Sequence, residues 1–224
     1  MKEKENKFEQ VVQTLCSPLY HFSPVDWVNE EAIEQFIENL IVVFPCGGES
    51  KRMTELNSTV HKTALSISDQ DTLLTRMIKF YANYGIKKFV LLIGINCDSV
   101  IKTTNTACQN LDIQISYSQD PGKPVGRGGA ILRAIELGYI NPSQHFLVHN
   151  ADDQIVNYQR NFLQDICQAH IAASQHGALA TAIVAVGVPF AYTALSIENS
   201  IVTCAAVKPR LPIPAHTGIT LFQK

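Results

Sequence analysis

A glycine-rich, basic stretch follows the short apolar segment Ile41–Phe44, and its charges are spaced in a way that suits a nucleoside triphosphate. Gly47 and Gly48 permit positive φ angles, so the backbone there can approach a ligand closely and point its N–H groups at anionic oxygens. Arg52 offers a planar guanidinium fork, and Lys62, ten residues later, offers a mobile point charge. An ordinary glycine turn would explain the two glycines alone, but the added basic residues favour a nucleotide-binding loop.

A pair of carboxylates, Asp152 and Asp153, follows the apolar segment Phe146–Val148. Mg²⁺ prefers one or two carboxylates together with phosphate oxygens and water, so a carboxylate at this place is a suitable ligand. The stretch Asn150–Asp153 also has the composition of a solvated turn. Because an anion-binding loop occurs in the same chain, we interpret Asp152 as a Mg²⁺ ligand.

Two further segments offer contacts to a ligand. Gly126, Gly128 and Gly129 open an apolar helical pattern, and bare N–H groups at a helix N-terminus can donate hydrogen bonds to a base or a phosphate. A tight strand–helix turn is the alternative interpretation of these glycines. Lys208 follows the apolar segment Ile201–Val207 and could face a sugar phosphate, although by itself it resembles any surface lysine.

Regular elements must position these residues, and from position 41 short apolar segments alternate with longer amphipathic ones. The predicted strands are Ile41–Phe44, Lys88–Ile93, Ile113–Ser116, His145–His149, Ala180–Val186, Ile201–Ala206 and Thr217–Phe222. The predicted helices are Thr72–Tyr84, Gly129–Gly138 and Asn161–His176, and residues 1–40 form a helical extension before a domain of residues 41–224. This alternation predicts a mostly parallel sheet covered by helices on both faces, with ligands bound beyond the carboxyl ends of its strands.

The composition narrows the class of protein. The 224 residues are 46% hydrophobic and 17% charged, which is typical of a chain with a sizeable core. A formal net charge of -2 argues against a nucleic-acid or membrane-surface binder. The longest apolar runs are too short to span a bilayer, and no apolar region typical of a signal peptide follows the charged start. Six scattered cysteines suit a reducing cytoplasm better than a disulfide framework.

Taken together and in order, five motifs resemble the sugar-1-phosphate nucleotidyltransferases, which make nucleotide sugars. The family's Gly-Gly-x-Gly-Thr-Arg-[Leu/Met] pattern and its later Pro-Lys pair match Gly47–Met53 and His61-Lys62 in spacing. The other four similarities lie at Lys123–Ala130, Phe146–Asp152, Val207–Pro209 and His216–Ile219. The resemblance implies an α/β, Rossmann-like (GT-A-like) fold, and the form of the second motif is most similar to the mannose- or heptose-phosphate guanylyltransferase branch.

The resemblance also implies a reaction and a role for each candidate residue. A sugar 1-phosphate would attack the α-phosphorus of a nucleoside triphosphate, with Mg²⁺ as cofactor, and pyrophosphate would leave. The implied roles are nucleotide contacts for Gly47 and Gly48, the leaving pyrophosphate for Arg52, the α-phosphate for Lys62, the base for Gly126, Gly128 and Gly129, Mg²⁺ for Asp152, and the sugar phosphate for Lys208.

The chain departs from the family pattern at several places. Ser50 and Lys51 stand where the family prefers Gly-Thr, Arg127 replaces a threonine, and Ala151 replaces a glycine. Val207 replaces a glutamate that helps to hold the sugar in the family. Lys224 comes before the position of the family's second acidic metal ligand. These departures leave open a non-catalytic regulatory protein that binds nucleotide sugars. A glycosyltransferase would use an acidic pair such as Asp152-Asp153, but it leaves the spacing of Arg52 and Lys62 unexplained.

Overall fold

The computed structural model describes residues 26–48, 61–94, 97–141 and 143–223. These residues fall into two compact units. The larger one, called the sheet unit here, contains residues 26–182 and 218–223, and the smaller one, called the ribbon unit, contains residues 183–217. In the described part of the chain, no helix is both long and apolar enough to cross a bilayer.

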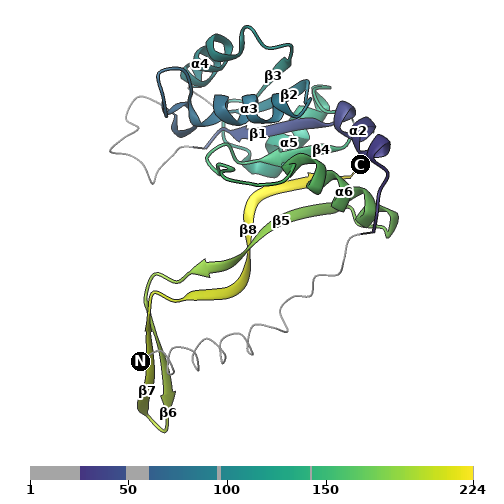
Figure 1. Cartoon of the computed structure of the whole chain (residues 1–224). Coiled ribbons are helices and arrows are strands. Elements are labelled where there is room, and N and C mark those ends of the chain that lie inside the picture. The colour runs from purple at the N-terminus through teal and green to yellow at the C-terminus, as the bar shows by residue number, and fades with distance from the viewer. Residues whose placement is uncertain (1–25, 49–60, 95–96, 142, 224) are drawn as a thin grey trace. The chain divides into compact units, whose positions relative to one another are not determined.

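A six-stranded sheet organises the fold, with the strand order β3-β2-β1-β4-β8-β5 (Figure 1). Its strands are β1 (Ile41–Cys46), β2 (Lys88–Ile93), β3 (Gln114–Gln119), β4 (Phe146–His149), β5 (Ala180–Pro189) and β8 (Arg210–Phe222). The pairs β1–β2, β1–β4 and β2–β3 are parallel, and β8 runs antiparallel to β4. The predicted α/β class with a mostly parallel sheet is therefore confirmed.

Helices connect these strands and bury both faces of the sheet. They are α2 (Glu30–Asn39), the 3₁₀ turn η3 (Lys62–Ala64), α3 (Leu73–Asn83), α4 (Asp98–Cys108), α5 (Gly126–Glu136) and α6 (Phe162–Gln175). Ile41 and Val43 of β1 pack in one core cluster with Ala134 of α5. Phe44 belongs to the other face, where its ring lies 6.1 Å from that of Tyr81 of α3. Burial on both faces explains why β1 is almost continuously apolar.

Two helices differ from the prediction. The helix α4 was not predicted, because its sequence is rich in threonine and only Val100, Thr104 and Cys108 are buried, which leaves no apolar periodicity to detect. The helix α5 begins at Gly126, three residues before the predicted start at Gly129. Glycine has a low helix propensity, so the sequence pattern placed this boundary too late.

The ribbon unit contains a hairpin that the sequence pattern revealed only in part. Its strands β6 (Thr193–Glu198) and β7 (Ile201–Val207) pair antiparallel. Asn199 and Ser200 join them with positive φ angles of 47° and 66°, as a two-residue hairpin turn requires. The strand β8 also begins earlier than the predicted Thr217, at Arg210, since Pro212 and Pro214 weaken the strand signal there.

A buried histidine links two elements of the sheet unit. His149, at the end of β4, has no exposed surface. Its Nδ1 accepts a hydrogen bond from the Tyr81 hydroxyl at 2.8 Å, and its Nε2–H donates to the Asp153 carbonyl oxygen at 2.7 Å. Burial lowers the pKa of His149 to about 4, which outweighs the opposing effects of the Asp153 carbonyl and the nearby carboxylates. The neutral ring of His149 thus links Tyr81 of α3 to the turn that follows β4.

Acid should therefore destabilise the sheet unit through His149. Its pKa in the folded protein, about 4, lies below that of the unfolded chain, so only the unfolded chain gains the proton as the pH falls from about 6.5 towards 4. The expected loss is about 3 kcal/mol of unfolding free energy across this window, measured by urea denaturation. His149→Gln, which cannot titrate, should show a shallower pH dependence, with His170 supplying part of the slope that remains. Equal slopes for both proteins would contradict this role.

Candidate active site

Several candidate residues follow the carboxyl ends of parallel strands in the same sheet. In the parallel pair β1–β4, Ile41 lies opposite Phe146 and Val43 opposite Val148. The chain therefore leaves both strands at the same edge of the sheet. The glycine turn follows β1, the acidic turn that contains Asp152 follows β4, and the start of α5 follows β3.

An ion pair joins the basic and acidic segments across 90 positions of the sequence. Lys62 begins η3, and its Nζ donates a hydrogen bond of 2.6 Å to Oδ2 of Asp152. The two side chains are 26% and 39% exposed, so solvent and ligands can reach them. Partial burial raises the pKa of Asp152, but the hydrogen bond and charge of Lys62, with help from Arg127, leave it below its ordinary value. Asp152 is therefore a carboxylate near neutral pH.

Glycines let the backbone come close at two places in this site. A Cβ on Gly47 would lie 3.1 Å from the backbone nitrogen of Gly94, which follows β2, so these two loops touch through their main chains. Gly126 has φ +74° at the start of α5, where Val125 supplies no side-chain cap. The first N–H groups of α5 thus lack a side-chain acceptor at the cap, and the effect of Arg127 on Asp152 shows that the two segments are close enough to interact.

The acidic turn is held by hydrogen bonds that leave its two carboxylates in different situations. The Asn150 backbone N–H donates to the Gly218 carbonyl at 3.1 Å, and the Asp153 N–H donates to the Asn150 carbonyl at 2.9 Å. The Asn150 side-chain amide also donates to Oδ2 of Asp153 at 3.0 Å. Asp153 is therefore engaged within the turn, whereas Asp152 is directed to Lys62.

Among the remaining candidates, the three glycines lie in the glycine turn and in the first turn of α5, whereas Arg52 and Lys208 are not placed in this site. Gly48, Gly128 and Gly129 are described, and Gly48 and Gly128 are exposed. Arg52 lies outside the described residues. Lys208 belongs to the ribbon unit, where it is exposed between β7 and β8 with φ +46°.

Sequence reasoning missed several residues that shape this edge. Gly94 had a detectable signal, because it follows a strand as Gly47 does. The sequence marks His61 only as the residue before Lys62, and neither His61 nor His149 carries a local sign of its hydrogen-bond partners. His61 contacts the carbonyl oxygen of Gly48 through Nε2 at 2.8 Å.

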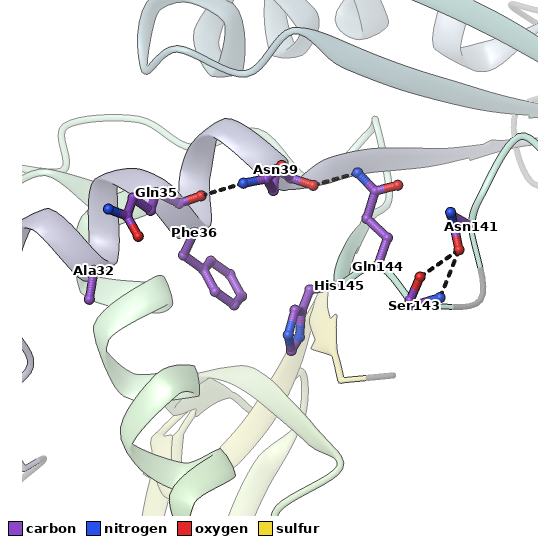
Figure 2. Close-up of a pocket in the computed structure, with 8 residues that line it drawn as sticks. All are labelled: Ala32, Gln35, Phe36, Asn39, Asn141, Ser143, Gln144 and His145. Carbon is purple, nitrogen blue, oxygen red and sulfur yellow. Dashed lines mark hydrogen bonds between the residues drawn. The ribbon is translucent and has the colours of Figure 1, made fainter.

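A pocket of about 590 Å³ lies at the other edge of the sheet unit (Figure 2). It is bordered by residues that precede β1 and β4 rather than follow them. Figure 2 shows Phe36 and His145 next to each other in its lining, with their ring centroids 4.7 Å apart. Its lining is Ala32, Gln35, Phe36, Asn39, Asn141, Ser143, Gln144 and His145. Burial lowers the pKa of His145, so this lining offers no positive charge at pH 7 to bind a triphosphate.

The donor atoms of the site suit a metal ion that arrives with phosphate ligands. Among the described residues, no three His, Cys, Asp or Glu side chains are grouped in a way that could hold a metal ion. Asp152 offers one accessible carboxylate beside the exposed glycine turn. Mg²⁺ is commonly held by one or two carboxylates, with phosphate oxygens and water completing its shell. The residues present therefore fit Mg²⁺ as part of a nucleotide complex.

Comparisons with known proteins agree with this geometry. A family model described as nucleotidyl transferase matches residues 42–222. No curated protein matches the sequence significantly. Among solved structures, a UDP-glucose pyrophosphorylase complexed with UDP-glucose is 17% identical with a TM-score of 0.55, and the match covers 82% of this chain and 75% of that one.

Two further structures share the fold. A protein assigned as a glucose-1-phosphate thymidylyltransferase from Bacillus anthracis, in complex with sucrose, is 16% identical with a TM-score of 0.58, covering 82% of this chain and 71% of that one. HddC from Yersinia pseudotuberculosis, complexed with GMP-PN, is 20% identical with a TM-score of 0.52, covering 82% and 76%. At these identities the similarity shows the fold alone.

The acidic turn depends on the absence of a side chain at Gly218. This glycine has φ +80°, and a Cβ there would collide with the side chains of Asp153 and Asn150. We expect Gly218→Ala to lower the unfolding free energy by about 1–3 kcal/mol more than Gly138→Ala does. This difference is the usual loss of stability when an added side chain overpacks a site. Gly138 is a matched control, because its φ is +76° but an added Cβ would meet nothing within 4 Å. Equal losses in urea denaturation would contradict the steric constraint.

Proposed function

This chain belongs to the nucleotidyl transferase family, and from that premise we propose that it transfers a nucleotidyl group from a nucleoside triphosphate to a sugar 1-phosphate. The products are a nucleotide sugar and pyrophosphate. The ion pair between Lys62 and Asp152 carries the proposal, since it brings a phosphate-binding cation and a metal-binding carboxylate to one strand edge. Neither residue is needed there for the core, because both side chains are partly exposed.

The reaction is an in-line displacement at phosphorus. A phosphate oxygen of the sugar 1-phosphate forms a bond to the α-phosphorus, and the bond from that phosphorus to the oxygen bridging the α- and β-phosphates breaks. The electron pair and the charge leave with pyrophosphate. Such transfers require mainly the positioning of the reactants and the neutralisation of charge, so no covalent enzyme intermediate is needed.

The chain's residues divide this work. Lys62 moves from Asp152 to the α-phosphate when the nucleotide binds, and Arg52 holds the departing pyrophosphate. Gly47 and Gly48 accommodate the phosphates through the backbone, Gly126, Gly128 and Gly129 border the base, and Lys208 contacts the sugar phosphate. Asp152 holds Mg²⁺, which when bound neutralises phosphate charge. In the structure, Lys62 and Asp152 neutralise each other, so Lys62 would exchange Asp152 for phosphate, and Asp152 would then be available to hold Mg²⁺.

The observations support the type of reaction more strongly than the identity of the nucleoside triphosphate or of the sugar 1-phosphate. We favour GTP, because the Gly128–Ile131 form of the second motif resembles the guanylyltransferase branch. One similar structure is a complex with GMP-PN and another with UDP-glucose, which supports testing several bases. Four described cysteines (Cys46, Cys97, Cys108 and Cys167) are buried thiols, which supports a reducing cytoplasm as the place of the reaction.

Pyrophosphate release tests the proposal. The chain is incubated with Mg²⁺ and each of five nucleoside triphosphates, crossed with mannose, glucose, heptose and N-acetylglucosamine 1-phosphates. One pair well above background establishes the activity and identifies both substrates. No release from any pair, with a nucleotide sugar still bound in calorimetry, would favour the regulatory alternative.

Lys62→Ala should lower turnover by roughly 10²–10³-fold, the scale for losing one charge-stabilising donor, with the loss mainly in kcat. Steady-state kinetics with the active pair measures this effect. Lys87→Ala is the matched control, because Lys87 forms an ion pair of 2.7 Å with the highly exposed Asp112. The control should keep its activity, and unchanged turnover in Lys62→Ala would remove Lys62 from the mechanism.

A further inference from the structure

We propose that His61 is a positioning residue that holds the glycine turn and Lys62 together as one phosphate-binding unit. The inference rests on the proposed function and extends it, since His61 is not expected to touch the substrate. His61 stands where the family pattern has a proline before the lysine. Because proline has no side-chain donor or acceptor, the hydrogen bonds of His61 are a feature of this chain.

Both ring nitrogens of His61 are engaged with the backbone of this site. Nε2 lies 2.8 Å from the carbonyl oxygen of Gly48, 13 positions earlier in the chain. Nδ1 accepts the backbone N–H of Thr63 at 3.3 Å and lies 2.8 Å from the Thr63 hydroxyl, which makes His61 the N-cap of η3. One side chain therefore joins the turn after β1 to the start of η3, where Lys62 is the first residue.

The direction of each hydrogen bond follows from these partners. A carbonyl oxygen can only accept, so Nε2 carries the proton and donates it to Gly48. The Thr63 N–H can only donate, so Nδ1 is unprotonated. Burial is the largest influence on the pKa of His61, which lies below its ordinary value despite the Gly48 carbonyl and Asp152. The neutral ring with Nε2–H is thus the form present at pH 7.

This contact matters because Gly48 has no side chain of its own to anchor it. Gly48 is exposed, has no side chain, and would meet nothing within 4 Å if it gained a Cβ. A glycine with such freedom loses more conformational entropy on ordering than any other residue. Holding its carbonyl oxygen on His61 orders the turn before a ligand arrives and keeps that oxygen from repelling phosphate. Lys62, the next residue in the chain, is positioned by the same contacts and forms its ion pair with Asp152.

Two substitutions separate the functions of the two nitrogens. His61→Asn keeps an oxygen near the place of Nδ1 and remains a good N-cap for Thr63, but its short side chain cannot reach Gly48. His61→Gln places an amide N–H near the place of Nε2 and keeps the donor to Gly48, while it loses the cap. A role in stability alone would affect both variants, whereas the positioning role predicts a defect only in His61→Asn.

The probe is inorganic tripolyphosphate with Mg²⁺, which represents the part common to all nucleoside triphosphates. We expect His61→Asn to raise its calorimetric Kd by about fivefold to tenfold, the scale of one lost hydrogen bond, and His61→Gln to stay within about twofold of the native chain. With the active substrate pair, His61→Asn should raise KM for the nucleotide and leave kcat nearly unchanged. Equal affinities in all three proteins, or equal losses in both variants, would overturn the positioning role.

A measurement without ligand distinguishes failure of this inference from failure of the proposed function. The ¹H–¹⁵N spectrum of the histidine-labelled chain should show a slowly exchanging Nε2–H for His61, which disappears in both variants. A His61 ring protonated at Nδ1 overturns the inference whatever the chain binds. A correct Nε2–H signal in a native chain that binds no tripolyphosphate instead overturns the proposed function, and the positioning role with it.

Discussion

The parallel pairing of β1 with β4 is the constraint on which the candidate site depends. These strands are far apart in sequence, yet their register aligns Ile41 with Phe146. The segments that follow the two strands therefore leave at the same edge of the sheet. Their side chains are buried against helices on both faces, so a shift of either strand would expose apolar surface. The hydrophobic core thereby sets the distance over which Lys62 meets Asp152.

Two neutral histidines make hydrogen bonds that hold the loops at this edge of the sheet. His149 accepts from Tyr81 within the core and donates to the carbonyl of Asp153, while His61 donates to the carbonyl of Gly48. An imidazole suits both places because it offers one donor and one acceptor at fixed angles in its neutral form. Burial lowers the pKa of each ring and maintains this form. Loops without much packing of their own thus acquire defined positions through single directional contacts.

The partial exposure of the ion pair is consistent with a site that must exchange partners. A fully buried pair would be costly to separate, because each charge would be left without solvent or a counter-ion. At exposures of 26% and 39%, Lys62 and Asp152 retain contact with water, so the proposed function would let Lys62 exchange Asp152 for a phosphate and Asp152 exchange Lys62 for Mg²⁺. In the proposed reaction, each of the two charges would therefore have a partner both before and after the nucleotide binds.

The sequence by itself determined the class of fold and most of the candidate residues. Apolar periodicity located every described strand except β6. Glycine or charge after a strand marked Gly47, Lys62, Gly126 and Asp152, because the chemistry of these residues is local. Periodicity could not reveal α4, whose buried positions are few, and residue type could not show which of Asp152 and Asp153 faces Lys62. Only the tertiary structure decided the partners of His61, His149 and Gly218, since hydrogen bonds and close approaches between distant segments depend on packing that no local pattern records.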